Sequence, residues 1–254
     1  MEKTFTYSIV IPAYNESERI TASLDKVLAH IATQGWVAEV IVVNDGSTDN
    51  TADIVRSYMR QNPIVRLLEN PGNKGKGYSV RHGMLEALGD ILLLTDADLS
   101  SPIYEARKLF DAIEKGGADI AIGSRWIQRE TQTLRQPFYR QVSGRVFNIM
   151  LRVVLRLKQK DTQCGFKAFT RQAALSVFPP QRIERWGFDP EILFLADKFK
   201  LKTAEIPVEW ANDERTKIKL TDGFRMFWEM MRVRWYSITG QYDHLKPAEA
   251  TILR

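Results

Sequence analysis

The sequence has very few residues of the kinds that build disulfide frameworks or cysteine-rich metal sites. It contains one cysteine, Cys164, and three histidines, His30, His82 and His244, among 254 residues. A single cysteine excludes an internal disulfide framework and any zinc site made from several cysteines. The three histidines lie far apart without the short spacing of a metal-binding motif, so we interpret each as a structural or surface residue.

Long apolar runs are also missing. No uncharged apolar stretch approaches the roughly 20 residues that a membrane-spanning helix needs. Glu2 and Lys3 lead directly into a strand-like segment without the apolar core of a signal peptide, so we expect a cytoplasmic protein. The net charge of +5 favours an anionic partner such as a phosphate or an acidic lipid surface, whereas no nucleic-acid-binding motif is present.

Apolar runs alternate with helix-like segments through the first half of the chain. The runs that predict strands cover residues 7–11, 39–43, 65–68, 91–95 and 119–122. The segments that predict helices cover residues 17–33, 50–60, 77–87 and 103–115. This alternation is typical of an α/β fold in which helices cover both faces of a mostly parallel sheet. A further strand is predicted near residues 164–170, and no linker separates a second independent domain.

Two carboxylates follow the apolar run at 91–95 and are the most informative feature of the chain. Asp96 and Asp98 are separated by one residue, and alternate residues of an extended strand point to the same side, so both can face one ligand. Carboxylate oxygens suit Mg²⁺ or Mn²⁺, and Mg²⁺ usually binds through one or two carboxylates plus substrate phosphates. The pair therefore predicts a divalent cation with a nucleoside diphosphate, and the alternative is an ordinary polar loop.

Three further polar segments are expected at the same edge of the sheet, because they follow strands or precede a helix. They cover residues 12–16, 44–49 and 73–77. Asp45 is a candidate to accept a hydrogen bond from a nucleobase, and Tyr14 is a candidate to pack on that base. The glycines of 73–77 permit close backbone approach before a helix N-terminus, which favours anions. Turns and helix caps explain the same residue types equally well.

A set of six motifs in chain order carries a resemblance to a known family. They lie at residues 12–16, 44–47, 75–77, 96–98, 123–125 and 161–167. Together they resemble the family 2 glycosyltransferases of the dolichyl-phosphate sugar synthase branch. The resemblance implies a metal-dependent hexosyltransferase with a GT-A fold, which is Rossmann-like, that uses Mg²⁺ or Mn²⁺ and transfers a sugar from a nucleotide sugar to a polyprenyl phosphate with inversion. We expect a catalytic domain at residues 1–220 and a C-terminal amphipathic helix and tail at 221–254.

The resemblance also implies roles for individual residues. The donor-binding positions are Pro12, Tyr14, Glu16, Asp45, Lys76 and Asp96. The metal pair is Asp96 and Asp98, with Asp98 the expected direct ligand and a catalytic residue. The positions implied to hold the acceptor phosphate are Arg125, Arg140 and Ser143. Asp189 and Glu191 are the candidate carboxylates for a base or for orienting the acceptor. For Arg140 the alternative is a solvated helix face, and for the two carboxylates it is an acidic first turn of a helix.

The residue two positions after Asp98 bears on the choice of donor. Mannosyl-type members usually have glutamine there, whereas this chain has Ser100, which resembles the glucosyl-type branch. The resemblance therefore favours UDP-glucose, with GDP-mannose or a water-soluble acceptor as the alternatives. A sugar nucleotidyltransferase would want a glycine-rich basic loop in place of the acidic segment at 12–16. A silent nucleotide-sugar binding module would not need both metal carboxylates.

A lipid acceptor requires contact with a bilayer surface. The segments at 145–156 and 224–238 mix arginines with large apolar residues, as helices that lie in the headgroup layer do. Peripheral attachment to the cytoplasmic membrane face is therefore one interpretation, and packing of both apolar faces on the core is the slightly favoured alternative. The polar segment at 212–217 is a candidate to close over the acceptor.

Overall fold

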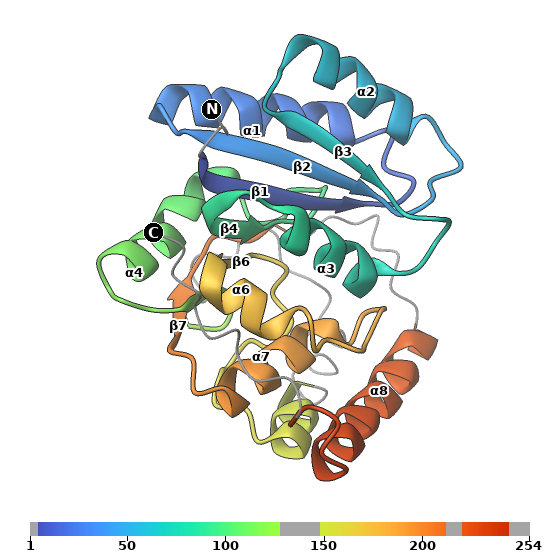
Figure 1. Cartoon of the computed structure of the whole chain (residues 1–254), viewed down its shortest axis with the longest axis vertical. Helices are drawn as coiled ribbons and strands as arrows, with labels where there is room; N and C mark the ends of the chain where they lie inside the picture. Colours follow the sequence, from blue (N-terminus) through green and yellow to red (C-terminus); the bar gives the residue numbers. More distant parts are fainter. Residues whose placement is uncertain (1–4, 128–147, 212–219, 244–254) are drawn as a thin grey trace.

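The computed structural model describes residues 5–127, 148–211 and 220–243, which form one sheet with helices on both faces (Figure 1). Seven strands lie in the order β3-β2-β1-β4-β6-β5-β7. Their bounds are β1 Phe5–Ala13, β2 Ala38–Asn44, β3 Val65–Glu69, β4 Gly89–Leu94, β5 Ile120–Ser124, β6 Lys167–Thr170 and β7 Thr203–Pro207. The segment at 212–217 lies outside the described residues.

All neighbouring strands in this sheet are parallel except at β6, which runs antiparallel to β4 and to β5. The mostly parallel sheet is as predicted. The strand near residues 164–170 was also predicted, but neither its direction nor its place between β4 and β5 was, and β7 was missed. These features depend on pairing between residues far apart in the chain, which a local pattern of apolar residues does not encode.

Two layers of helices cover the faces of the sheet. One layer contains α1 Ile20–Gln34, α2 Thr51–Gln61, the short 3₁₀ helix η1 Ile103–Glu105 and α4 Ala106–Glu114. The opposite layer contains α3 Lys76–Glu86, α6 Arg171–Val177 and α7 Phe188–Lys198. Because the strands alternate their side chains, Ile9 and Ile11 of β1 join the core under the first layer, whereas Val10 joins the core under the second.

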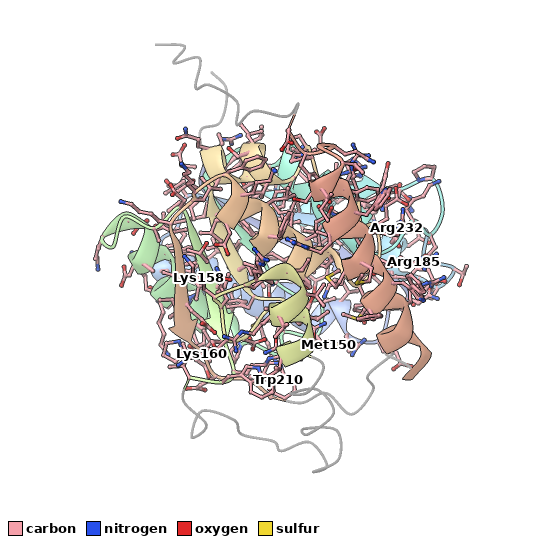
Figure 2. The ribbon with its side chains drawn as sticks, turned by 90° about the horizontal axis from the view of Figure 1, so that it is seen from below. Met150, Lys158, Lys160, Arg185, Trp210 and Arg232 are labelled. Carbon is pink, nitrogen blue, oxygen red and sulfur yellow. The ribbon has the colours of Figure 1, made fainter. Side chains whose placement is uncertain are left out.

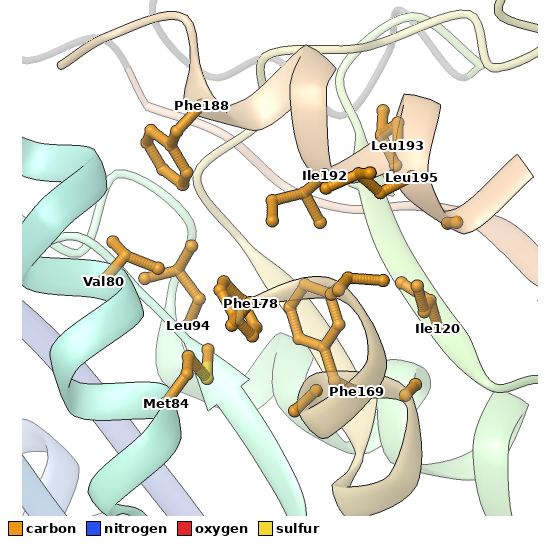
Figure 3. Close-up of a cluster of buried hydrophobic side chains, with 14 of the residues drawn as sticks. Val80, Met84, Leu94, Ile120, Phe169, Phe178, Phe188, Ile192, Leu193 and Leu195 are labelled. Atoms are coloured by element: carbon orange, nitrogen blue, oxygen red, sulfur yellow. The ribbon is translucent and has the colours of Figure 1, made fainter. Parts of the chain in front are cut away.

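The core of the second layer is aromatic at its centre. Figure 3 shows Phe169 of β6 and Phe178 beside Leu94 of β4, with Ile192 of α7 above them. The rings of Phe169 and Phe178 meet edge to face with 5.2 Å between centroids, a favourable geometry for two aromatic side chains. This packing attaches α6 and α7 to the sheet and so sets where the start of α7 lies.

The helix at residues 148–155 and α8, Leu220–Ile238, lie side by side below the second layer (Figures 1 and 2). Each buries one face, with Leu151 and Leu155 on the first helix and Met230 and Val233 on α8. The expected packing on the core is therefore found for these faces. No helix in the described ranges is both long and apolar enough to cross a membrane.

A close contact between α3 and the sheet depends on Gly83. A Cβ atom at this position would lie 2.5 Å from Cγ1 of Val10 and 2.8 Å from Cγ2 of Val43. The helix backbone therefore rests directly on the side chains of β1 and β2. This contact places the first turn of α3 beside the carboxyl ends of the strands, where the candidate site lies.

We predict that Gly83→Ala lowers the free energy of unfolding by about 1–3 kcal/mol, because the added methyl overpacks the contact with Val10 and Val43. Helix propensity alone would give the opposite sign, a gain of roughly 1 kcal/mol. Urea denaturation followed by circular dichroism measures the change, with Lys26→Ala on the exposed face of α1 as the control. Unchanged or increased stability of Gly83→Ala would show that α3 does not rest on the sheet in this way.

Candidate active site

A cavity of about 510 Å³ opens where the parallel strands end, within the range of roughly 300–1,000 Å³ that is usual for small-molecule sites. Loops after β1, β2, β4 and β5 contribute to its wall, together with the first turns of α3 and α7. It brings together these residues predicted from the sequence: Pro12, Tyr14, Glu16, Asp45, Lys76, Asp96, Asp98, Ser100, Arg125 and Asp189. Arg140 and Ser143 lie outside the described residues.

Acidic side chains crowd one ammonium group in this cavity. Nζ of Lys76, the first residue of α3, lies 2.5 Å from Oδ1 of Asp96. Burial by itself would lower the pKa of Lys76, but the charges of Asp96, Asp189 and Asp98 raise it. Burial raises the pKa of Asp98, and the neighbouring charge of Asp96 raises it further. The negative charge of these three carboxylates therefore exceeds the single positive charge that Lys76 supplies.

This donor set fits a hard divalent cation that is also held by phosphates. Asp96 and Asp98 both line the cavity, and Asp98 forms no ion pair within the described part of the chain. No group of three or more histidine, cysteine, aspartate or glutamate side chains suited to a metal occurs among the described residues. Mg²⁺ commonly takes one or two carboxylates and completes its shell with water and substrate phosphates, so the pair is sufficient.

The wall behind Asp96 is formed by backbone. A Cβ atom at Gly165 would lie 2.3 Å from Oδ2 of Asp96, so a larger residue there would displace this carboxylate. Gly165 belongs to the segment that leads into β6, the antiparallel strand between β4 and β5. The motif at 161–167 therefore acts here as a close partner of the acidic pair, a contact that the sequence alone did not predict.

Asp45 organises the loop that precedes α3. It is buried, and its Oδ1 accepts hydrogen bonds from Nδ2 of Asn70 at 2.8 Å and from the backbone N–H of Lys74 at 2.9 Å. Its Oδ2 accepts one from the N–H of Gly75 at 2.8 Å. A carboxylate that accepts several hydrogen bonds fixes the donors around it. Asp45 thus holds the chain immediately before Lys76, besides lining the cavity as predicted for a nucleobase contact.

The motif after β2 also holds the loop after β1. The backbone N–H of Asn15 donates to Oγ of Ser47 at 2.9 Å, and that of Ser17 donates to Oδ2 of Asp49 at 3.0 Å. Burial would raise the pKa of Asp49, but hydrogen bonds from Thr51 and Ser17 lower it to about 2. Asp49 therefore remains charged and ties the two loops together. Tyr14, in the loop after β1, is 38% exposed, so a ligand can reach its side chain.

Asp189 enters the cavity from the first turn of α7 and is held by a buried lysine. Nζ of Lys167 lies 2.5 Å from Oδ1 of Asp189 and also donates to the backbone carbonyl of Cys164. Burial raises the pKa of Asp189, while the charges of Lys167 and Lys76 oppose the rise. A carboxyl group with a raised pKa in a cavity is suited to exchange a proton with a ligand.

Arg125, after β5, is gripped by a buried carboxylate. Its Nε and Nη2 donate to the two oxygens of Asp161 at 2.7 and 2.8 Å, and its guanidinium lies 5.5 Å from the ring centroid of Trp210. The bidentate pair fixes the guanidinium plane at the cavity wall. Asp161 and Trp210 therefore hold Arg125, which was predicted to bind phosphate. Neither Asp161 nor Trp210 had an individual role in the sequence predictions.

Glu191, the other candidate carboxylate, is not among the residues that line this cavity. Its Oε1 accepts from the hydroxyl of Tyr242 at 2.6 Å and from the N–H of Arg182 at 2.9 Å, and its Oε2 accepts from the N–H of Ile183 at 2.8 Å. Residues two positions apart on a helix do not face the same way, so Asp189 and Glu191 point to different surroundings. Glu191 is thus buried away from the cavity and accepts hydrogen bonds from three donors.

Several cavity residues had no role in the sequence predictions. They are Arg19, Gln163, Arg185, Trp186, Trp210 and Met226. Nζ of Lys76 lies 5.4 Å from the ring centroid of Trp186, a cation–π contact. Trp186 stands three residues before Asp189. Its closeness in sequence to a candidate catalytic residue is the one signal by which the sequence could have suggested it as a site residue. Met226 lies on α8, which no local pattern connects to this cavity.

Comparison with known proteins agrees with this description. The model of the family described as glycosyl transferase family 2 matches residues 8–178. A dolichyl-phosphate beta-glucosyltransferase of Trichomonas vaginalis is 37% identical, covering 96% of this chain and 75% of the relative. The proteins of the same name from Homo sapiens and Saccharomyces cerevisiae are 32% and 34% identical, and each comparison covers 92% of this chain and 76% of the relative.

Solved structures show the same fold at lower sequence identity. The glucosyl-3-phosphoglycerate synthase from Mycobacterium tuberculosis, in complex with UDP, has a TM-score of 0.65 at 19% identity, covering 90% of this chain and 80% of that one. The complex of that enzyme with Mn²⁺ and UDP-glucose has a TM-score of 0.65 at 20% identity, covering 92% and 78%. The fold of this chain is therefore that of the GT-A glycosyltransferases, as predicted.

We predict a pH dependence of stability from Glu191, because burial raises its pKa from 4.5 to about 6 despite the hydrogen bonds it accepts. Between pH 4.5 and about 6, Glu191 keeps its proton in the folded chain but has lost it in the unfolded chain. The stabilisation is therefore complete below pH 4.5 and is lost as the pH rises through about 6. Relative to Glu191→Gln, which cannot titrate, the native chain should lose about 2 kcal/mol of unfolding free energy over this window.

Chemical denaturation of both proteins at several pH values measures that difference. A difference that stays constant from pH 4 to about 7 would contradict the raised pKa of Glu191.

Proposed function

This chain belongs to glycosyltransferase family 2, and from that membership we propose that it transfers glucose from UDP-glucose to dolichyl phosphate or another polyprenyl phosphate, with inversion at the anomeric carbon. The observation that carries the proposal is the match, at 31–37% identity, to relatives named dolichyl-phosphate beta-glucosyltransferase. The shape and charge of the cavity support it independently, because the cavity has the volume and the acidic pair that a metal-bound nucleoside diphosphate needs.

The donor half of the site consists of the loops after β1 and β2, the start of α3 and the acidic pair. Tyr14 and Asp45 would contact the nucleoside, and Lys76 would approach the diphosphate. Asp96 and Asp98 would hold a divalent cation, which when bound neutralises the charge that develops on the leaving diphosphate. Lys76 already provides positive charge at this point, since its ammonium lies 2.5 Å from Asp96.

The acceptor half of the site consists of Arg125 and Asp189. A phosphate monoester is mostly a dianion near neutral pH, since its second pKa is about 6, so its oxygen can attack with little help from a base. The fixed guanidinium of Arg125 would hold that phosphate in line with the sugar. Asp189 can take the proton from the fraction of the acceptor that is still protonated, because its own pKa is raised.

Contact with a lipid surface would come from the outward face of α8 and of the helix at 148–155. On α8, Trp228, Met231, Trp235 and Ile238 are exposed and recur every three or four residues, so they form one stripe. Exposed arginines at 225 and 232 accompany this stripe. Tryptophan and arginine together are suited to the boundary between headgroups and acyl chains.

We predict that Asp98→Ala lowers glucosyl transfer by at least about 100-fold, because it removes charge stabilisation. The free energy of unfolding should fall by only about 1 kcal/mol, because one hydrogen bond from the N–H of Ser100 is lost. The assay supplies purified protein with Mn²⁺, a short polyprenyl phosphate and a panel of nucleotide sugars, and identifies the lipid product by mass. Asp90→Ala, at the exposed opposite end of β4, is the matched control. Transfer from GDP-mannose alone would contradict the choice of UDP-glucose as the donor. Near-normal turnover of Asp98→Ala would contradict the assignment of Asp96 and Asp98 as metal ligands.

We predict that replacing Trp228 and Trp235 together by serine lowers binding to vesicles that contain anionic lipid by about tenfold or more, because two exposed aromatic side chains leave the interface. Co-sedimentation measures binding, and transfer to a short water-soluble acceptor should be unaffected. The control replaces Val37 and Leu88, which are similarly exposed at the amino ends of β2 and β4. Equal loss in both double variants would show that α8 is not the lipid-facing surface.

A further inference from the structure

The segment at residues 181–187 connects α3, which carries Lys76, to α8. On the α3 side, the N–H of Tyr78 donates to the carbonyl of Glu184 at 3.0 Å, and Nε2 of Gln181 donates to the carbonyl of Gly77 at 2.9 Å. A Cβ atom at Gly77 would lie 2.5 Å from the carbonyl oxygen of Ile183. The segment is therefore packed backbone to backbone against the first turn of α3.

On the other side, the segment is held by a carboxylate from α8. Oε2 of Glu229 accepts a hydrogen bond from the N–H of Gly187 at 3.0 Å. A Cβ atom at Gly187 would lie 2.6 Å from that oxygen and 2.8 Å from Cε of Met230, so α8 touches the backbone there. Glu229 is only 8% exposed, and a buried carboxylate needs a hydrogen-bond donor to offset the loss of water. The contact is therefore specific rather than an incidental surface pairing.

Between these two attachments the segment presents Arg185 and Trp186 to the cavity. The ring of Trp186 stands 5.4 Å from Nζ of Lys76, which in turn lies 2.5 Å from Asp96. A continuous set of contacts thus runs from Glu229 through Gly187 and Trp186 to the ammonium group at the acidic pair. Within the described part of the chain no hydrogen bond or ion pair joins Glu229 to Lys76 or Asp96, so its contact with them runs through the segment.

We propose that Glu229 is a positioning residue for the donor half of the site. By holding Gly187 it fixes the ring of Trp186, and that ring keeps Lys76 aimed at Asp96 and the diphosphate. The inference rests on the proposed function for the identity of the donor. It adds that α8, whose outer stripe is proposed to face lipid, also supports the donor site from its inner face. In the acceptor half, Arg125 is held by Asp161 instead, whereas Asp189 follows Gly187 by two residues on α7 and shares part of this support.

The test compares Glu229→Ala and Glu229→Gln with the native chain. Removing the carboxylate should raise the KM for UDP-glucose and the Kd for UDP by about tenfold, the effect of losing one charge-assisted hydrogen bond. The KM for the polyprenyl phosphate should rise less, because Arg125 is held by Asp161 and only Asp189 shares the support of Gly187. Glutamine keeps an oxygen that can accept from Gly187, so it should restore most of the donor affinity. Glu86→Ala, at the exposed far end of α3, is the matched control.

A double-mutant cycle with Trp186→Ala separates positioning from a general loss of structure. If Glu229 acts through Trp186, its substitution should add little once that ring is gone. Additive effects, or equal increases in the KM of donor and acceptor, would overturn the proposal, as would native UDP affinity in Glu229→Ala. Failure of the native chain to bind UDP or transfer glucose would instead overturn the proposed function, and the two results are distinguishable.

Discussion

The ion pair between Lys76 and Asp96 is the contact around which the candidate active site is arranged. It links the first residue of α3 to the carboxyl end of β4 across the cavity. Lys76 pairs with Asp96 and Lys167 pairs with Asp189, whereas Asp98 forms no ion pair within the described part of the chain. A cavity carboxylate without an ion pair is suited to a further cation. This feature of the acidic pair agrees with the proposal that the site takes a diphosphate together with a divalent cation.

Close backbone contacts build the walls that hold this pair in place. Side-chain atoms are excluded where Gly165 meets Asp96, where Gly46 meets Gly72, and where Gly77 meets the segment at 181–187. These contacts hold the loops of the site against neighbouring segments. The loops therefore do not need a large hydrophobic core of their own to stay in place. The carboxylates of Asp45, which is buried, and of Asp49, which is half-buried, add hydrogen bonds to the same loops. The cavity is thus shaped before a ligand enters, which lowers the entropic cost of binding.

The C-terminal helix α8 has two faces with different tasks. Its inner face contributes Met230 and Val233 to the core and Glu229 to the segment beside the donor site. Its outer face exposes Trp228 and Trp235. The division of the chain into residues 1–220 and 221–254 remains a prediction, but the inner contacts show that α8 is packed on the rest of the described chain. A lipid-facing helix that also supports the donor site would place acceptor capture and donor binding on one element.

The sequence by itself determined the alternating sheet, the family and the acidic pair, because burial patterns and short motifs are local. It also placed Asp45, Lys76 and Arg125 among the candidates that the cavity then brings together. Only the tertiary structure separated Asp189 from Glu191, which the motif treats alike. The partner of Glu191, Tyr242, stands 51 residues away, and the partner of Gly187 stands 42 residues away. Such pairings depend on how α7 and α8 pack together, and periodicity within one segment carries no information about that packing.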